Sequence, residues 1–151
     1  MRNLLLVLAL VVTSASAQTR AFDSVQGKRA ATFDDVLNIK GIQGVTVSPD
    51  GRQVIYGIRE WVSEQDKMES RTHLWKVPAD GSSAARQITF GDKGESQGQF
   101  SPDGKFVSFV ASRGSADAKA QVYLMSIDGG EAWKLTDAKE SVISYSWAPD
   151  Q

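Results

Sequence analysis

The sequence repeats one tight-turn pattern, and this repeat restricts the fold more than any other feature. Val47-Ser48-Pro49-Asp50-Gly51 matches Phe100-Ser101-Pro102-Asp103-Gly104, and Trp147-Ala148-Pro149-Asp150 begins a third copy. Pro has the φ that the second position of a type I turn requires, Asp can bond nearby backbone amides, and Gly takes the position with positive φ. Each copy therefore predicts a corner between two antiparallel strands.

The segments between the corners repeat as well. Asp80-Gly81 matches Asp128-Gly129, and Arg86-Gln87-Ile88-Thr89 matches Trp133-Lys134-Leu135-Thr136. Most of these matches recur at a period in the high forties, and each unit carries four short strand signals, which is typical of propeller blades.

We therefore predict an all-β fold, an incomplete β-propeller with two four-stranded blades and the start of a third. The first blade is expected at about residues 42–90, the second at about 95–137, and the third from about 142 to 151. The strand after each corner alternates, so one apolar face should be buried between blades. That face comprises Val54, Tyr56 and Ile58 in the first copy and Val107, Phe109 and Ala111 in the second.

The first blade carries five more residues than the second between its second and third strands. They lie in or around residues 60–71, a polar stretch that we expect to form a loop. Insertions in a repeat usually map to loops on one face, and that face is often the working one.

The N-terminal residues predict an exported protein. Arg2 gives a positive start, residues 4–12 are apolar, and Ala15-Ser16-Ala17 supplies small residues for cleavage, so residues 1–17 are predicted to be a signal peptide. The apolar run is shorter than the ~20 residues that a membrane anchor needs. We expect a periplasmic or secreted protein with no membrane contact after cleavage.

A leader with a short helix is predicted at residues 18–41. Thr32 can cap a helix, Asp35 stands in the capping-box position, and Phe33, Val36 and Leu37 share one face. Such a helix usually plugs or flanks a neighbouring β unit.

Composition excludes several classes of site. The net charge of -1 offers no general attraction for nucleic acid, and the absence of cysteine removes thiolate metal sites and a cysteine nucleophile. His73 is the single histidine, and the acidic residues near glycines lack the spacing of a calcium loop. We predict no metal and no cofactor, and we expect His73 to be a solvent-edge or hydrogen-bonded strand residue.

Gly94-Glu95-Ser96-Gln97-Gly98 matches the G-x-S-x-G pattern of α/β-hydrolase nucleophiles. That nucleophile requires a strand-to-helix turn and a later histidine, whereas this stretch joins two blades and no histidine follows Ser96. We therefore predict no catalytic residue in this chain.

The Ser-Pro-Asp-Gly corners, the Asp-Gly hairpins and the closing Thr make the chain resemble the propeller repeats (PD40 type) of TolB and of the prolyl oligopeptidase family. The segment from Thr32 to Gly51 looks like the start of secreted bacterial dipeptidyl-peptidase or acylaminoacyl-peptidase members. The likeness covers about residues 32–150, and a non-enzymatic TolB-like binding propeller is the alternative.

The resemblance to the peptidases implies a propeller that restricts entry and can hold the substrate's amino end. A C-terminal α/β-hydrolase domain with Ser, Asp and His would cleave the peptide. The sequence stops inside the third corner, before such a domain could begin, so we expect a fragment that is inactive alone. Its expected partners are a peptide substrate, through the missing domain, and further copies of itself, through open blade edges.

The resemblance also suggests a site in the predicted loop. A carboxylate there could pair with a peptide's α-ammonium, as propeller acids do in the dipeptidyl-peptidase branch, and Trp61 could line the same cavity. A solvated polar connection, with Trp61 packed beneath it, is the competing interpretation. The candidate substrate-binding residues are Glu60, Trp61, Glu64 and Glu69.

Overall fold

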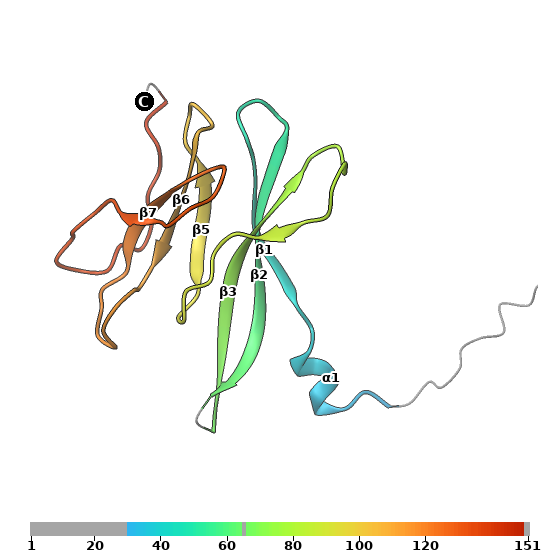
Figure 1. The fold of residues 1–151 in the computed structure, drawn as a ribbon. Coiled ribbons are helices and arrows are strands. Elements are labelled where there is room, and N and C mark those ends of the chain that lie inside the picture. Colours follow the sequence, from blue (N-terminus) through green and yellow to red (C-terminus); the bar gives the residue numbers. More distant parts are fainter. Residues whose placement is uncertain (1–29, 65, 150–151) are drawn as a thin grey trace, which may run out of the picture. The chain divides into compact units, whose positions relative to one another are not determined.

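A computed structural model describes residues 30–64 and 66–149 (Figure 1). The chain divides into two units, Met1–Ala31 and Thr32–Gln151, and the second unit holds the helix and the strands described below. The predicted signal peptide lies outside the described residues. Among the described residues, no helix combines the length and apolarity needed to cross a bilayer.

The short helix α1 (Phe33–Leu37) begins with the predicted capping box. The Thr32 backbone N–H donates to Asp35 Oδ2 at 2.7 Å, and the Asp35 N–H donates to Thr32 Oγ1 at 3.4 Å. None of the helix residues is buried, and Phe33 is 73% exposed. In the described part of the chain the helix therefore does not plug a blade, and capping rather than packing holds its five residues. The alternative, that it flanks the first blade, stays a prediction.

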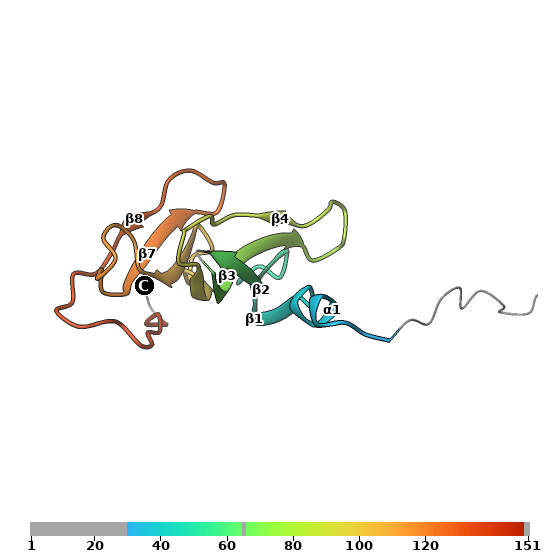
Figure 2. The ribbon, with the colours of Figure 1, turned by 90° about the horizontal axis from the view of Figure 1, so that it is seen from below.

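Two antiparallel four-stranded sheets form the rest of the unit, each a simple meander in chain order (Figures 1 and 2). This confirms the predicted all-β architecture of two propeller blades. The first sheet contains β1 (Gly41–Val47), β2 (Gln53–Glu64), β3 (Lys67–Pro78) and β4 (Arg86–Gln87); the second contains β5 (Glu95–Phe100), β6 (Phe106–Ala111), β7 (Gln121–Ser126) and β8 (Trp133–Lys134).

The two complete corners have the same hydrogen-bonded geometry. Ser48 Oγ donates to Asp50 Oδ1 at 2.6 Å, and Ser101 Oγ donates to Asp103 Oδ1 at 2.6 Å. Gly51 and Gly104 follow with φ of 72° and 70°. The serine hydroxyl first, and then a backbone N–H two residues on, lower the pKa of each aspartate below its ordinary value. The corner pattern in the sequence thus corresponds to a local network of hydrogen bonds between residues two positions apart.

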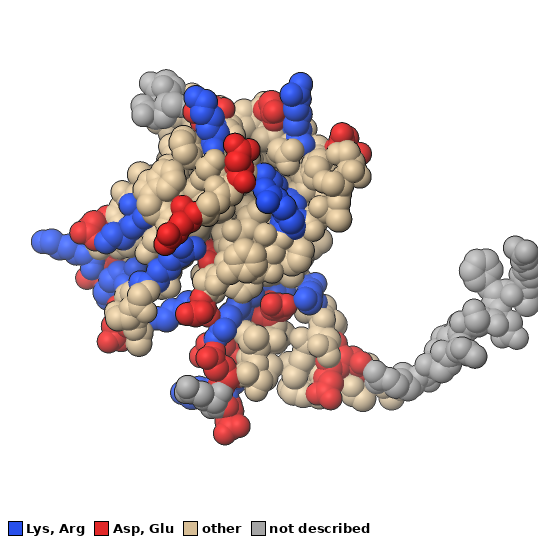
Figure 3. All heavy atoms as spheres, viewed as in Figure 1, with Lys and Arg blue, Asp and Glu red and all other residues tan. Residues whose placement is uncertain are grey.

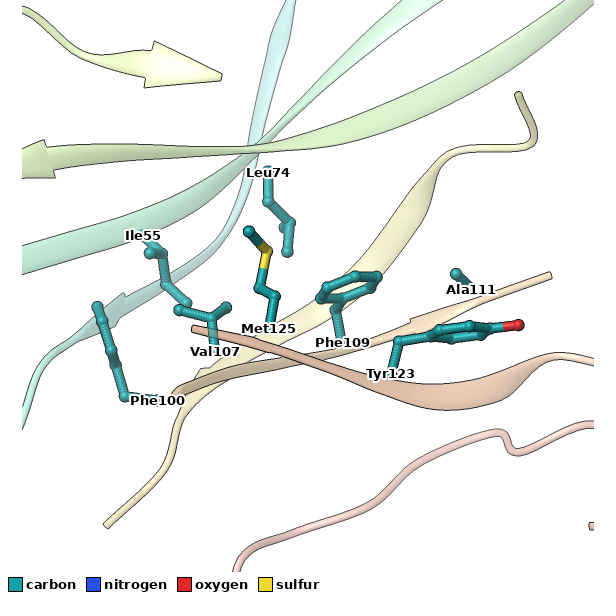
Figure 4. Close-up of a cluster of buried hydrophobic side chains, with 8 residues drawn as sticks. All are labelled: Ile55, Leu74, Phe100, Val107, Phe109, Ala111, Tyr123 and Met125. Atoms are coloured by element: carbon teal, nitrogen blue, oxygen red, sulfur yellow. The ribbon is translucent and has the colours of Figure 1, made fainter. Parts of the chain in front are cut away.

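The core lies between the two sheets, as Figure 4 shows. The first sheet contributes Ile55 and Leu74, both at most 2% exposed. The side chains that meet them come from β5, β6 and β7: Phe100, Val107, Phe109, Ala111, Tyr123 and Met125.

The face predicted to be buried is buried in the second blade but only half-buried in the first. Val54, Tyr56 and Ile58 alternate with Ile55, and Ile55 is the residue that points toward the second sheet. The first sheet therefore packs its Ile55 face against the following blade. The opposite face, with Val54, Tyr56 and Ile58, is the one that would meet a preceding blade, and in the described chain no sheet precedes the first.

The third corner packs against the second sheet through a polar contact. Ser108 Oγ, fully buried on β6, accepts from Trp147 Nε1 at 2.8 Å and lies 2.8 Å from the Tyr145 hydroxyl. Burial raises the pKa of Tyr145 to about 12. Trp147 is the repeat equivalent of Phe100, so the hydrogen-bonded Ser108 contact takes the place of the apolar Ile55 contact one blade earlier.

Candidate functional site

The insertion in the first blade is a two-stranded arm, which we define as residues 60–64 of β2 and 67–71 of β3. The ladder continues without a break to the pair Glu64 and Lys67, while β1 pairs with β2 only as far as Arg59. Figure 1 shows this hairpin extending past the other strands of its sheet. The expectation of a loop here is wrong, because the stretch forms two paired strands. Trp61 and Met68 lie on one face and Val62 on the other, so both faces are mostly polar and compatible with a ribbon that is solvated on both sides.

The arm separates the four predicted substrate-binding residues. Alternation along the paired strands puts Glu60, Glu64 and Glu69 on one face and Trp61 on the other, with Met68. Trp61 is 44% exposed and Met68 42%, so Trp61 does not pack beneath a loop. Figure 3 shows acidic and basic side chains side by side on this part of the surface.

Two of the three carboxylates already have cationic partners. Glu60 Oε2 lies 2.9 Å from Lys40 Nζ, and Glu64 forms an ion pair with Arg71. Glu69 has no ion-pair partner among the described residues. Exposed ion pairs contribute little stability, so a cationic ligand group can replace Lys40 or Arg71 as the partner of Glu60 or Glu64. A role of the four residues in substrate binding stays a prediction.

The most buried charged cluster joins the two blades and centres on Glu95, whose side chain is fully buried. Its Oε2 lies 3.0 Å from His73 Nδ1 on β3, and its Oε1 accepts from the backbone N–H of Gly91 at 2.8 Å. Arg113, after β6, lies 3.5 Å from Oε1. The expectation that His73 is a hydrogen-bonded strand residue is confirmed.

Two aromatic rings also contact the Arg113 guanidinium. Its Cζ lies 5.3 Å from the centre of the Phe109 ring and 4.9 Å from that of Tyr123. A cation at this distance from two ring faces is attracted by their quadrupoles. The cluster thus connects a strand of the first blade to the core of the second, which is a structural role.

The cluster offers no nucleophile. Ser96 lies within β5, paired with Val110, and is exposed rather than set on a strand-to-helix turn. The hydrolase motif therefore stays rejected on geometry as well as on chain order. Within residues 30–64 and 66–149, no group of three or more His, Asp or Glu side chains is placed to hold a metal ion.

Sequence reasoning missed Glu95 and Arg113 as a pair. The glycines around Glu95 drew attention to Ser96, and nothing in the spacing shows that residues 73, 95 and 113 converge. The only signal in the sequence was an acidic residue flanked by glycines at a predicted junction between blades. Its partners come from two different sheets, so only the packing of the blades identifies them.

A pocket of about 390 Å³ opens beside this cluster, between the end of the first blade and the outer part of the second. Arg113 and Lys93 are among its lining residues, as are Asp92 and Glu131. Lys93 Nζ already donates to the backbone carbonyls of Ser115 and Ala116. Opposite charges and one engaged lysine give the pocket no clear preference for the charge of a ligand.

Replacing the central carboxylate with an amide, Glu95→Gln, is expected to lower the free energy of unfolding by about 1–3 kcal/mol, because the buried partners lose a charged acceptor. Urea denaturation followed by circular dichroism measures this. Glu140→Gln is the matched control, since Glu140 is 86% exposed and pairs with Lys119 at 3.6 Å; its change should stay within about 0.5 kcal/mol. Equal losses in the two variants would contradict a stabilising role for the cluster.

Comparison with known proteins shows that the chain is similar to parts of longer proteins. No family model matches the sequence. The chain is 34% identical over 123 residues to the uncharacterized peptidase YuxL of Bacillus subtilis, covering 82% of this chain and 18% of YuxL. It is 31% identical over 115 residues to the uncharacterized protein Atu1656 of Agrobacterium fabrum, covering 71% of this chain and 36% of that protein.

Solved structures share the arrangement of the strands. The AtxE2 isopeptidase superposes with a TM-score of 0.63 at 15% identity, over 80% of this chain and 22% of the isopeptidase. A putative TolB from Agrobacterium tumefaciens superposes with a TM-score of 0.53 at 20% identity, over 74% of this chain and 35% of that structure. The fold is that of β-propeller blades. The chain spans between about a fifth and about a third of the length of these proteins.

Proposed function

We propose that this chain is the propeller part of an exported serine peptidase of the prolyl oligopeptidase family. In this proposal the propeller restricts which peptides reach an α/β-hydrolase domain that lies outside the sequence. The 34% identity to a peptidase over 82% of the chain is the observation that carries it. The structural likeness to an isopeptidase agrees with it at the level of the fold.

The described residues themselves fit a supporting role rather than a catalytic one. Their single histidine is bonded to a buried carboxylate, and the serine of the hydrolase-like motif is exposed on a strand. Hydrolysis in this proposal therefore depends on the absent domain. Export rests on the signal-peptide pattern of residues 1–17, and the mature protein would begin at Gln18.

A second candidate is a non-enzymatic, TolB-like binding propeller. The superposition on a putative TolB, with a TM-score of 0.53, favours it at the level of the fold. A fold can carry either function, so blades alone do not separate the two.

The reading frame downstream of Gln151 tests the proposal. We expect further repeats, then a Gly-x-Ser-x-Gly-Gly turn and a later histidine. The purified longer protein should cleave short chromogenic peptides, and should cleave the same bond far more slowly within a long polypeptide. The isolated hydrolase domain, if it folds, should lose that difference in length preference.

Two outcomes would refute the peptidase assignment. One is a stop codon directly after Gln151 together with accumulation of the 151-residue protein in cells. The other is a longer frame that contains further blades but no hydrolase domain, which would favour the TolB-like candidate.

A further inference from the structure

The arm has an unpaired strand edge. On β3, the strand β4 pairs only with Trp75 and Lys76, and the backbone of Leu74 bonds to Ile88 and Thr89. No described residue forms a ladder with the outer edge of residues 67–71. An exposed edge of this kind is a template for a further strand.

The backbone groups on this edge point outward at alternate residues. In an antiparallel ladder, every second residue turns its N–H and C=O away from its partner strand. Counted from the turn between Glu64 and Lys67, these residues on β3 are Met68 and Ser70. Both are exposed.

The side chains of the edge carry charges of alternating sign on one face, in the order Lys67, Glu69 and Arg71. Arg71 is already paired with Glu64. Lys67 and Glu69 have no ion-pair partner among the described residues. The edge therefore has one free cation and one free anion, two positions apart.

We propose that residues 67–69 of β3 pair antiparallel with the same residues of a second copy of this chain, about a two-fold axis at Met68. In this register Lys67 of each copy lies directly opposite Glu69 of the other. Both free charges gain a partner, and each cross-strand pair of opposite charge is favourable. The contact is isologous, so one pairing produces two such ion pairs.

The neighbouring arrangements are less favourable. A two-fold axis at Glu69 would oppose the two Glu69 carboxylates and place Lys67 opposite Arg71. An axis at Ser70 would place Met68 of the copy opposite Thr72, where Gly94 already lies against the edge: a Cβ on Gly94 would be 2.8 Å from the backbone N and O of Thr72. The other edge of the arm carries Glu60 and Glu64 and no cation, so it repels a copy of itself.

Pairing would also cover the weak point of the arm. A two-stranded ribbon that is solvated on both faces is marginally stable, whereas four strands with an apolar face are stable. Joining two arms gives a four-stranded sheet in which Trp61 and Met68 of both copies share one face. The contact is small, so we expect a weak dimer that forms as the concentration rises.

Sedimentation velocity of the mature chain, residues 18–151, over a range of concentrations tests this proposal. Lys67→Glu places carboxylates opposite each other twice and should weaken dimerisation by about tenfold or more. The double variant Lys67→Glu with Glu69→Lys recreates both pairs and should restore it. Met68→Pro removes an outward N–H while leaving the ladder of the arm intact, and should abolish dimerisation.

The control is Lys139→Glu, the same change of charge at an exposed lysine outside the arm; it should leave dimerisation unchanged. Circular dichroism of each variant should match that of the parent chain. A chain that is monomeric at every concentration would overturn the proposal. So would failure of the double variant to restore dimerisation, or association that is lost on changing Tyr56 on the open face of the first sheet and unaffected by Lys67→Glu. These outcomes are independent of the proposed peptidase function.

Discussion

The Gly94→Ala variant is expected to lose about 2–5 kcal/mol of unfolding free energy. Gly94 has a φ of 76°, which an L side chain adopts only with strain, and a Cβ placed there would lie 2.8 Å from both the backbone N and O of Thr72. Backbone atoms in a paired strand cannot move aside as a flexible side chain can. The chain passes from the first blade to the second at this point, directly before Glu95, so the shift would also displace the buried cluster.

Gly114→Ala is the matched control for this variant. Gly114 also has a positive φ, of 96°, but no atom lies within 4 Å of its added Cβ. The unfolding free energy of this variant should fall only by the conformational cost of about 1–2 kcal/mol. Urea denaturation of both variants separates strain from collision, and equal losses would show that close packing at Gly94 contributes nothing.

The Phe109→Ala variant is expected to lose about 3–5 kcal/mol, because it removes the largest fully buried side chain between the blades. Phe109 is 0% exposed, stacks on Tyr123 with ring centres 6.1 Å apart, and supports the Arg113 guanidinium. The cavity left behind would be bounded by two sheets that cannot both collapse into it. Thermal or urea unfolding monitored by near-UV circular dichroism would report the loss.

Phe106→Ala provides the comparison on the same strand. Phe106 is only partly buried, and its ring meets Trp133 edge-on at 5.7 Å, where Trp133 is itself 46% exposed. Its loss should be markedly smaller, because less apolar area is returned to water. A loss as large as that of Phe109→Ala would place the main core outside the contact between the blades.

The corners and the sheets were predictable because their causes are local. Ser48 with Asp50, and Ser101 with Asp103, form the same short network in both copies. Each turn thereby determines where one strand ends and the next begins, and the period of two assigns the faces. The order of strands in each blade follows from the positions of these turns, since strands that are neighbours in the chain pair with each other.

The arm was missed because composition and periodicity disagreed there. Glu60, Glu64, Lys67 and Glu69 make the stretch polar, as in a loop, whereas a ribbon that is solvated on both faces needs no buried side. The extended pairing with β3 decided the outcome. It also separated Trp61 from the carboxylates, which the linear order of residues had placed together.

The sequence alone determined the local structure of this protein: the two corners with their aspartate hydrogen bonds, the four consecutive strands of each blade and the capping of the short helix. Each depends on residues within a few positions of one another. Tertiary structure decided which face of each blade is covered, that Glu95 meets His73 and Arg113, and that the insertion is a paired arm with a free edge. Those contacts join residues far apart in the chain, and burial and register depend on how whole sheets pack, which no local pattern of side chains specifies.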